Sequence, residues 1–357
     1  MSTDYLVLNI GGKKMKKYHN TKDRNTSMKI ENQQNSEVIK LPRIMLLIGF
    51  FVLVALVILV VVHFTEVEQF ALLLSKAEPK WLFLAVLLQI GTYLCAGFIW
   101  NQVIRSAQHR VPLGALARLS VEKLSIDQLL PTDGISGNLV VLQIMRRLGL
   151  PNWLAMEAML VDILSHYTAF AIVTFLALSI LWFYHDITNI ICYLVVIFAV
   201  VLVIVPITIL WLLAHRNNQP PLWLLRFHPI AKASEVIKSV SPDRVLSPTL
   251  LIITSLLSMT IFLLDAGTLW TMMRVINCSV GIMTTFVAIV IASIAGTISF
   301  LPGGIGGFEA GSVTVLTLLG VPIEAALTGT LLLRGFTLWF PLIPGILLVR
   351  HDVNIRL

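Results

Sequence analysis

Apolar residues in this chain gather in continuous blocks that are long enough to cross a bilayer, which takes about 20 residues of helix. The blocks run at about 44–64, 81–103, 153–183, 187–214, 248–273 and 323–349. Charged residues make up only 13% of the chain, whereas soluble domains carry about 25%, so too few remain to cover a water-facing surface. The sequence therefore predicts an all-α polytopic membrane protein and excludes soluble enzymes, secreted mini-domains and nucleic-acid modules.

Two further helical stretches, 112–130 and 280–300, are each followed by a shorter segment of helix length, at 137–149 and 308–320. The first stretch carries four charged residues, and the second ends in a break rich in proline and glycine. Non-helical backbone at membrane depth is tolerated only where protein or water satisfies its polar groups. We therefore expect two re-entrant helical hairpins, named hairpin A and hairpin B in chain order.

Two segments framed by the same leucines, glycines and prolines point to an internal repeat. The first reads LLPTDGISGNLVVLQIMRRLGLP and ends at Pro151, and the second reads LPGGIGGFEAGSVTVLTLLGVP and ends at Pro322. Near the start of the two segments, Pro131 precedes Pro302 by the same number of residues as Pro151 precedes Pro322. The segments therefore align without a gap. Extending that offset also pairs the neighbouring spans. Chance similarity between apolar segments is the alternative explanation.

Repeat A covers about 77–184 and repeat B about 248–349. Three predicted crossings separate the first span of repeat A from that of repeat B, and they are 81–103, 153–183 and 187–214. An odd number of crossings turns the second repeat over. We therefore expect inverted-topology repeats, each with a re-entrant hairpin, as in alternating-access transporters.

Basic residues predict the orientation independently, because cytoplasmic loops carry an excess of Lys and Arg. Segment 1–43 holds nine basic and four acidic residues, and we expect a disordered cytoplasmic tail there. Loop 215–247 mixes cations with aromatic residues and is expected at the cytoplasmic surface. With both termini cytoplasmic in a cell membrane, hairpin A opens from the cytoplasm and hairpin B from outside.

The glycine-rich break of hairpin B is the most informative motif. It consists of Pro302, Gly303, Gly304, Gly306 and Gly307. Backbone N–H groups in such a break need partners, and the N-terminus of the helix that follows attracts phosphate or carboxylate. The sequence therefore predicts an anion-binding break. A turn needed only for tight packing is the alternative.

Arg334 lies about eleven residues inside the last apolar block. A charge at that depth is costly and suggests a functional site with an opposite charge nearby. Glu309, at the start of the helix after the glycine break, is the expected partner, followed by Asp265. We expect Arg334 and the break to bind an anionic headgroup, while a salt bridge that only joins helices is the alternative.

Asp162 and His166 are four residues apart in the block 153–183 and share one helix face. They fit either a proton relay or a buried hydrogen-bonded pair. Three distant cysteines have no metal-ligand spacing, and the nucleotide-binding, zinc and nucleophile motifs of enzymes are missing. We therefore expect no metal and no cofactor.

The stretch LPGGIGGFEAG followed by LLGVP, together with the earlier LLP and LGLP framing, resembles the lysylphosphatidylglycerol synthase transmembrane region, or flippase-like family. The resemblance covers residues 44–350, which we expect to form one transmembrane domain. It implies movement of aminoacylated phospholipids or lipid-linked sugars between leaflets, with the glycine break and Glu309 forming the re-entrant core and Arg334 in the span that follows.

Two departures from the family pattern are visible. The chain ends just after the last span, where full synthases carry an aminoacyltransferase domain, so lipid aminoacylation is not expected. Hairpin A has Thr132-Asp133-Gly134 and Asn138 where a glycine- and arginine-rich, acidic version is expected.

The sequence predicts a non-enzymatic translocator of a lipid with an anionic phosphate headgroup. Its expected partners are the lipid itself and either a second copy or a separate lipid-modifying enzyme, with no nucleic acid. One alternative is a membrane-embedded transferase for lipid-linked substrates, which would need a group donor and Asp162 or His166. The other is a non-catalytic membrane subunit of such an enzyme, in which replacing Arg334 would have no effect.

Overall fold

The computed structural model describes residues 78–129, 135–184, 240–299, 302–339 and 341, with scattered positions between 198 and 214. All of them belong to one compact unit, Gly49–Leu357. Several predictions therefore fall outside the described residues: the tail 1–43, the span 44–64, most of the span 187–214, most of the loop 215–247, the start of the break in hairpin A and the end of the last span.

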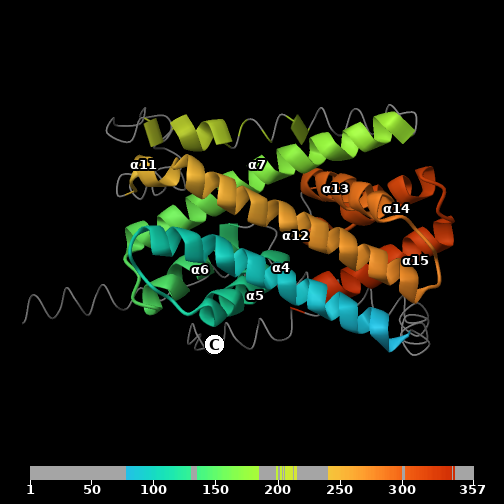
Figure 1. Ribbon diagram of the computed structural model, residues 1–357, viewed down its shortest axis with the longest axis horizontal. Coiled ribbons are helices and arrows are strands. Elements are labelled where there is room, and N and C mark those ends of the chain that lie inside the picture. Colours follow the sequence, from blue (N-terminus) through green and yellow to red (C-terminus); the bar gives the residue numbers. More distant parts are fainter. Residues whose placement is uncertain are drawn as a thin grey trace, which may run out of the picture. The chain divides into compact units, whose positions relative to one another are not determined.

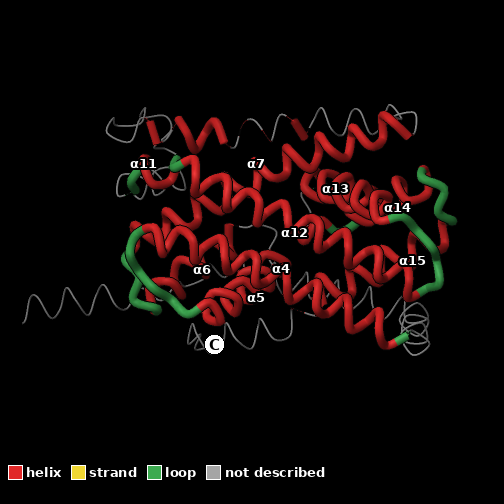
Figure 2. The backbone as a smooth tube through the Cα atoms, in the orientation of Figure 1, coloured by secondary structure: helices red, strands yellow, loops and turns green. Residues whose placement is uncertain are grey.

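The described elements are helices (Figures 1 and 2). Repeat A contains α4 (Pro79–Ser106), α5 (Leu113–Leu129), α6 (Ile135–Arg147) and α7 (Asn152–Tyr184). Repeat B contains α12 (Pro248–Val275), α13 (Ile282–Ile298), α14 (Gly307–Leu318) and α15 (Ile323–Arg334). Three short elements complete the description: α11 (Pro242–Val245), the 3-10 turn η1 (Pro302–Gly304) and the π-helical turn η2 (Gly335–Trp339).

Three of the described helices, α4, α7 and α12, are long and apolar enough to cross a membrane. Prolines at the start of α4 and α12 suit the first turn of a helix, where the missing N–H has no partner to lose. Gln108 and Asn277, just after these helices, take left-handed backbone with φ of 62° and 59°. The chain is an all-α membrane protein, as its hydropathy predicts.

The described helices follow the order that the predicted repeat requires, with α4 to α7 matching α12 to α15. Helices α4 and α12 each have 28 residues, and they begin 169 positions apart, at 79 and 248. Gly149 and Gly320 are both left-handed, with φ of 81° and 87°, and they stand 171 positions apart. The prediction of one constant offset is therefore wrong by two residues. Repeat B holds two extra residues around its glycine break, so one offset cannot serve both sides of that break.

Helices α4 and α12 pack against each other in antiparallel directions (Figure 1). A Cβ atom on Gly91 would lie 3.2 Å from Leu264 Cδ1, and one on Gly267 would lie 3.3 Å from Leu88 Cδ1. Moving three residues forward along α4, from Leu88 to Gly91, therefore corresponds to moving three residues back along α12, from Gly267 to Leu264. Inverted repeats require this relation between their leading helices, and the inversion across a membrane stays a prediction.

Within the described ranges the apolar residues form two core clusters, one around each hairpin. Hairpin B packs with the first half of α4, the second half of α12 and the second half of α7, including Phe170 and Val173. Hairpin A packs with the second half of α4 and the first half of α7, including Leu154 and Ala155. The long helices therefore hold the two hairpins at different positions along their length (Figure 1).

The helix predicted over 323–349 changes form after Arg334. Helix α15 ends there, and η2 continues as a π-helical turn over Gly335–Trp339. Single π-turns inside helices are rare and are frequent at functional sites. Here the helix type changes directly after a buried arginine.

Candidate functional site

The break between α13 and α14 is built from glycines in left-handed backbone. Gly303, Gly304 and Gly306 have φ of 58°, 66° and 82°. Residues with a Cβ atom are strained in this region, by about 1 to 2 kcal/mol each. These three positions therefore require glycine for the path of the chain, and the path ends with Gly306 as the N-cap of α14.

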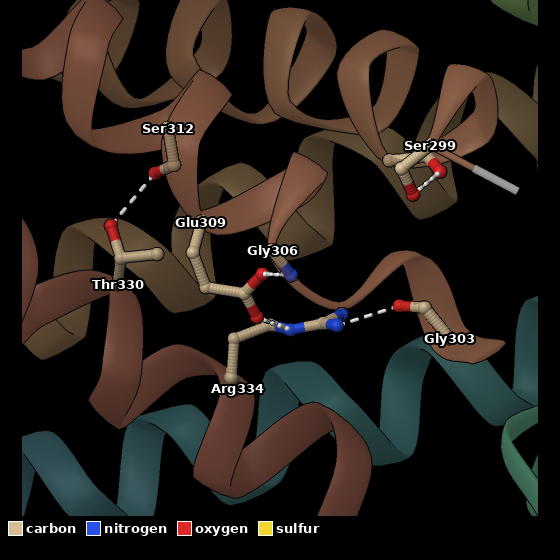
Figure 3. Close-up of polar contacts among 8 residues, drawn as sticks. Ser299, Gly303, Gly306, Glu309, Ser312, Thr330 and Arg334 are labelled. Carbon is tan, nitrogen blue, oxygen red and sulfur yellow. Dashed lines mark hydrogen bonds and ion pairs between the residues drawn. The ribbon is translucent and has the colours of Figure 1, made fainter. Parts of the chain in front are cut away.

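Glu309 lies in the first turn of α14 and bridges the break to the next helix (Figure 3). Its Oε2 accepts a hydrogen bond from the Gly306 N–H, with a nitrogen to oxygen distance of 2.6 Å. Its Oε1 accepts from Nε of Arg334, also at 2.6 Å. One carboxylate thus sits between a helix N-terminus and a guanidinium.

Arg334 is the last residue of α15, and only 8% of its surface is exposed. Besides Glu309, it donates from Nη2 to the Gly303 carbonyl at 2.6 Å, and its Cζ lies 4.7 Å from the ring centroid of Phe308. The two hydrogen bonds use two of the five N–H donors of a guanidinium. Arg334 can therefore hold the break in place and still contact another anion.

The next glycines of the motif serve packing. A Cβ atom on Gly307 would meet the Ala295 carbonyl of α13, and one on Gly311 would lie 2.9 Å from Ala295 Cβ and 3.1 Å from Ala292 Cα. Helices α13 and α14 are therefore closer together than side chains would allow. The packing alternative therefore holds at Gly307 and Gly311. The earlier glycines shape the break, and anion binding there stays a prediction.

A second polar contact joins α14 to α15 near the ion pair (Figure 3). Ser312 Oγ and Thr330 Oγ1 are 2.8 Å apart, and both residues are fully buried. Ser312 is not among the residues that the sequence predicts for this site. A spacing signal was available, because Ser312 follows Glu309 by three residues and Thr330 precedes Arg334 by four, which places each pair on one helix face.

Asp162 and His166 are not hydrogen bonded to each other in the described part of the chain. Asp162 lies within electrostatic reach of Lys123 and Trp100. His166 stacks on Phe262, with ring centroids 5.7 Å apart. The hydrogen-bonded pair suggested by their spacing is therefore wrong, and a role in a proton relay or in a polar lining stays a prediction.

Lys123 and Asp127 of α5 form polar contacts within hairpin A. Lys123 Nζ lies 3.0 Å from Asp127 Oδ2. Asp127 Oδ1 accepts a hydrogen bond from the Gly137 N–H at 2.9 Å, in the first turn of α6. Hairpin A is thus closed by a carboxylate on a helix N-terminus, as hairpin B is by Glu309.

Asp265 of α12 does not pair with Arg334 among the described residues. It lies beside Thr92 and Tyr93 of the antiparallel helix α4. The expectation that Asp265 is an alternative partner of Arg334 is therefore wrong. Its side chain belongs to the contact between the leading helices of the two repeats.

Hairpin A touches the break of hairpin B. Helix α5 contacts η1, and Ser125 Oγ donates to the carbonyl of Pro341, at 2.9 Å. Ser125 also lies 2.8 Å from the Val121 carbonyl of its own helix. The first hairpin thus packs against the glycine break and against the chain that follows Arg334.

Comparison with known families finds a match over most of the chain. A family model described as the lysylphosphatidylglycerol synthase TM region matches residues 46–345. No curated protein matches the chain.

Proposed function

The chain belongs to the lysylphosphatidylglycerol synthase TM region family, and from that premise we propose that it moves a lipid with an anionic phosphate headgroup between membrane leaflets. The observation that carries the proposal is the position of the Glu309 carboxylate, which lies between the Gly306 N–H and the Arg334 guanidinium. An aminoacyl-phospholipid or a lipid-linked sugar or polyprenyl phosphate has the required headgroup.

The Glu309 carboxylate occupies the kind of place that a phosphate oxygen prefers. A helix N-terminus offers free N–H groups and a positive dipole end, and a guanidinium adds charge and a planar set of donors. Glu309 supplies the negative charge while the site holds no lipid. This arrangement keeps Arg334 paired, since an unpaired buried charge is strongly destabilising.

A phosphate headgroup that reaches the break would compete with Glu309 for Arg334. The three donors that Arg334 does not spend on Glu309 and Gly303 give the headgroup a first contact. When the phosphate takes over the guanidinium, Glu309 is released and can face a cationic part of the headgroup. The exchange links binding of the lipid to a change in the contact between α14 and α15.

Two hairpins that open from opposite sides of the membrane suit alternating access. The antiparallel leading helices and the contact of α5 with η1 support such a mechanism. The acyl or prenyl tails would stay in the bilayer while the headgroup passes along the hairpins. We place the protein in the cell membrane with both termini cytoplasmic, acting as a translocator without group transfer, alone or beside a second copy or a lipid-modifying enzyme.

Leaflet translocation of labelled lipids in proteoliposomes tests the proposal. The panel contains phosphatidylglycerol, an aminoacyl-phosphatidylglycerol, a polyprenyl phosphate and phosphatidylcholine, with and without an ion gradient. Arg334→Ala is compared with wild type and with Arg146→Ala, which removes an exposed arginine at the end of α6. We expect selective translocation that Arg334→Ala abolishes and Arg146→Ala retains.

A second variant guards against loss of folding. Glu309→Gln with Arg334→Gln removes both charges and keeps side chains of similar shape, so no buried charge is left alone. Translocation of every lipid at the wild-type rate in this folded double variant would overturn the proposal. Product formation that needs a group donor and Asp162 or His166 would favour the transferase, and an Arg334→Ala variant without any effect would favour a non-catalytic subunit.

A further inference from the structure

The turn between α4 and α5 forms a second polar site, away from the glycine break. Arg105, Gln108, His109 and Arg110 line a pocket of about 420 Å³. Small-molecule sites in proteins commonly have volumes of about 300 to 1,000 Å³. The turn follows Ile104, which belongs to the apolar cluster of hairpin A. Arg334 instead follows Leu333, which belongs to the cluster of hairpin B, so the two sites lie at different clusters.

The backbone of this turn is fixed by local hydrogen bonds. Gln108 is left-handed, its N–H donates to the Arg105 carbonyl at 3.0 Å, and the His109 N–H donates to the Ile104 carbonyl at 3.1 Å. His109 Nδ1 lies 2.8 Å from the Ala107 carbonyl. A carbonyl only accepts, so Nδ1 carries the hydrogen and the ring is held in one orientation.

The positive charge of the pocket is not neutralised within the described part of the chain. Arg105 and Arg110 are exposed, and neither has an ion pair with a described residue. Nearby, Arg244 lies 4.5 Å above the Trp153 ring, but its charge is matched by Glu157 at 3.1 Å. Two guanidinium groups and an imidazole around one pocket favour a phosphate, which arginine binds with two parallel hydrogen bonds.

The repeat shows that the turn itself does not require these cations. At the matching turn of repeat B, Arg274 and the left-handed Asn277 stand where repeat A has Arg105 and Gln108. Arg274 is covered there by Trp270, with Cζ 5.1 Å from the ring centroid. The next positions are Cys278 and Ser279, where repeat A has a histidine and an arginine. The same turn conformation therefore forms in repeat B without a cluster of exposed cationic side chains.

We propose that the α4–α5 turn of repeat A is a phosphate-binding site, separate from the Glu309–Arg334 pair. Its ligand is a phosphate monoester or diester, either in an anionic lipid headgroup at the membrane surface or in free solution. The site goes beyond the proposed translocation and does not depend on it. It lies on the side of the protein that the charge distribution predicts to be cytoplasmic.

Binding to the purified full chain tests this site with two probes. The first probe is inorganic phosphate, titrated by calorimetry at constant ionic strength, and the second is phosphatidylglycerol against phosphatidylcholine, counted as bound lipids by native mass spectrometry. The test variant is Arg105→Ala with Arg110→Ala. Its matched control is Arg146→Ala with Arg147→Ala, which removes two exposed arginines predicted to lie on the same side.

We expect the test variant to lose affinity for at least one probe about tenfold or more, as the loss of charged hydrogen bonds does, while the control binds as wild type does. Loss of inorganic phosphate binding identifies a site open to free phosphate. Loss of phosphatidylglycerol binding alone identifies a site for a lipid headgroup. Equal losses in the test variant and the control, or no loss in either, would overturn the proposal.

Two further measurements keep the outcome clear. Because Arg334 also binds phosphate under the proposed function, the comparison is repeated in the Arg334→Ala background, where the turn should still distinguish the test variant from the control. Failure of translocation with intact binding at the turn would then count against the proposed function alone. If the double variant does not fold, Arg110→Gln, at an exposed position outside the helices, replaces it.

Discussion

Glu309 and Arg334 meet at 2.6 Å across two helices, and the same carboxylate also accepts the Gly306 N–H. The pair therefore joins the N-terminus of α14 to the C-terminal end of α15. Side chains of the two partners are 20% and 10% exposed, so the contact is largely shielded from water. A ligand that takes the Arg334 Nε donor from Glu309 therefore breaks this contact.

Glu309→Gln should change how the protein responds to anionic lipid. The amide keeps the shape but removes the charge, so the buried arginine loses its partner and the lipid-free protein should be destabilised by about 1 to 3 kcal/mol. An anionic headgroup then meets no competitor, and phosphatidylglycerol should raise the melting temperature of the variant more than that of wild type. Thermal unfolding with and without the lipid measures this. Equal shifts in both proteins would contradict competition at Arg334.

Gly306→Ala should weaken the break through its backbone alone. No atom would lie within 4 Å of the added Cβ, but φ at this position is 82°, which disfavours alanine by about 1 to 2 kcal/mol. Gly114→Ala is the matched control, since it also meets open space and lies in α5 with ordinary helical backbone. The control should be neutral or stabilising by up to about 1 kcal/mol. A melting temperature that falls equally in both variants would argue against strain in the break.

Ser312 and Thr330 should behave as one unit. Ser312→Ala and Thr330→Val each leave one buried hydroxyl group without its partner, at about 1 to 3 kcal/mol, and the double variant should lose less than the sum of the two. A double-mutant cycle of unfolding free energies in detergent measures the coupling. Additive effects would show that the hydroxyl contact contributes nothing to the contact between α14 and α15.

The inversion of the repeats can be tested with single cysteines. Ser136 serves for hairpin A, and Ile305, which is 37% exposed, serves for hairpin B. Gly307 is unsuitable, because a side chain there would strike the Ala295 carbonyl. In a chain whose natural cysteines are replaced by serine, we expect an impermeant thiol reagent to reach the two positions from opposite sides of the membrane. Labelling of both from one side would refute inverted repeats.

Much of the fold could be predicted because its signals are local. The apolar blocks at 81–103, 153–183 and 248–273 correspond to α4, α7 and α12 within a few residues. The hairpin helices also lie within a few residues of their predicted ranges. Hydropathy, helix-breaking residues and helical spacing act over one or two turns, so they are readable without knowledge of the packing.

The candidate site was only partly readable in this way. Glu309 and Arg334 could be named as partners because both stand out as charges in apolar sequence. The spacing of Asp162 and His166 suggested a pair that the structure does not form, since α5 and α4 supply other neighbours to Asp162. The role of Asp265 was also mistaken, because it depends on the crossing of α4 and α12.

The sequence by itself determined the membrane character, the bounds of α4, α7 and α12 to within a few residues, the two hairpins and the glycine break with its charged residues. Only the tertiary structure decided that α4 and α12 pack directly against each other, that hairpin A touches the break of hairpin B, and that the Glu309 carboxylate joins Gly306 to Arg334. The physical reason is one of range. Backbone preference and hydropathy are properties of neighbouring residues, whereas these contacts join segments that meet only when apolar helices pack and leave their few polar groups to find each other.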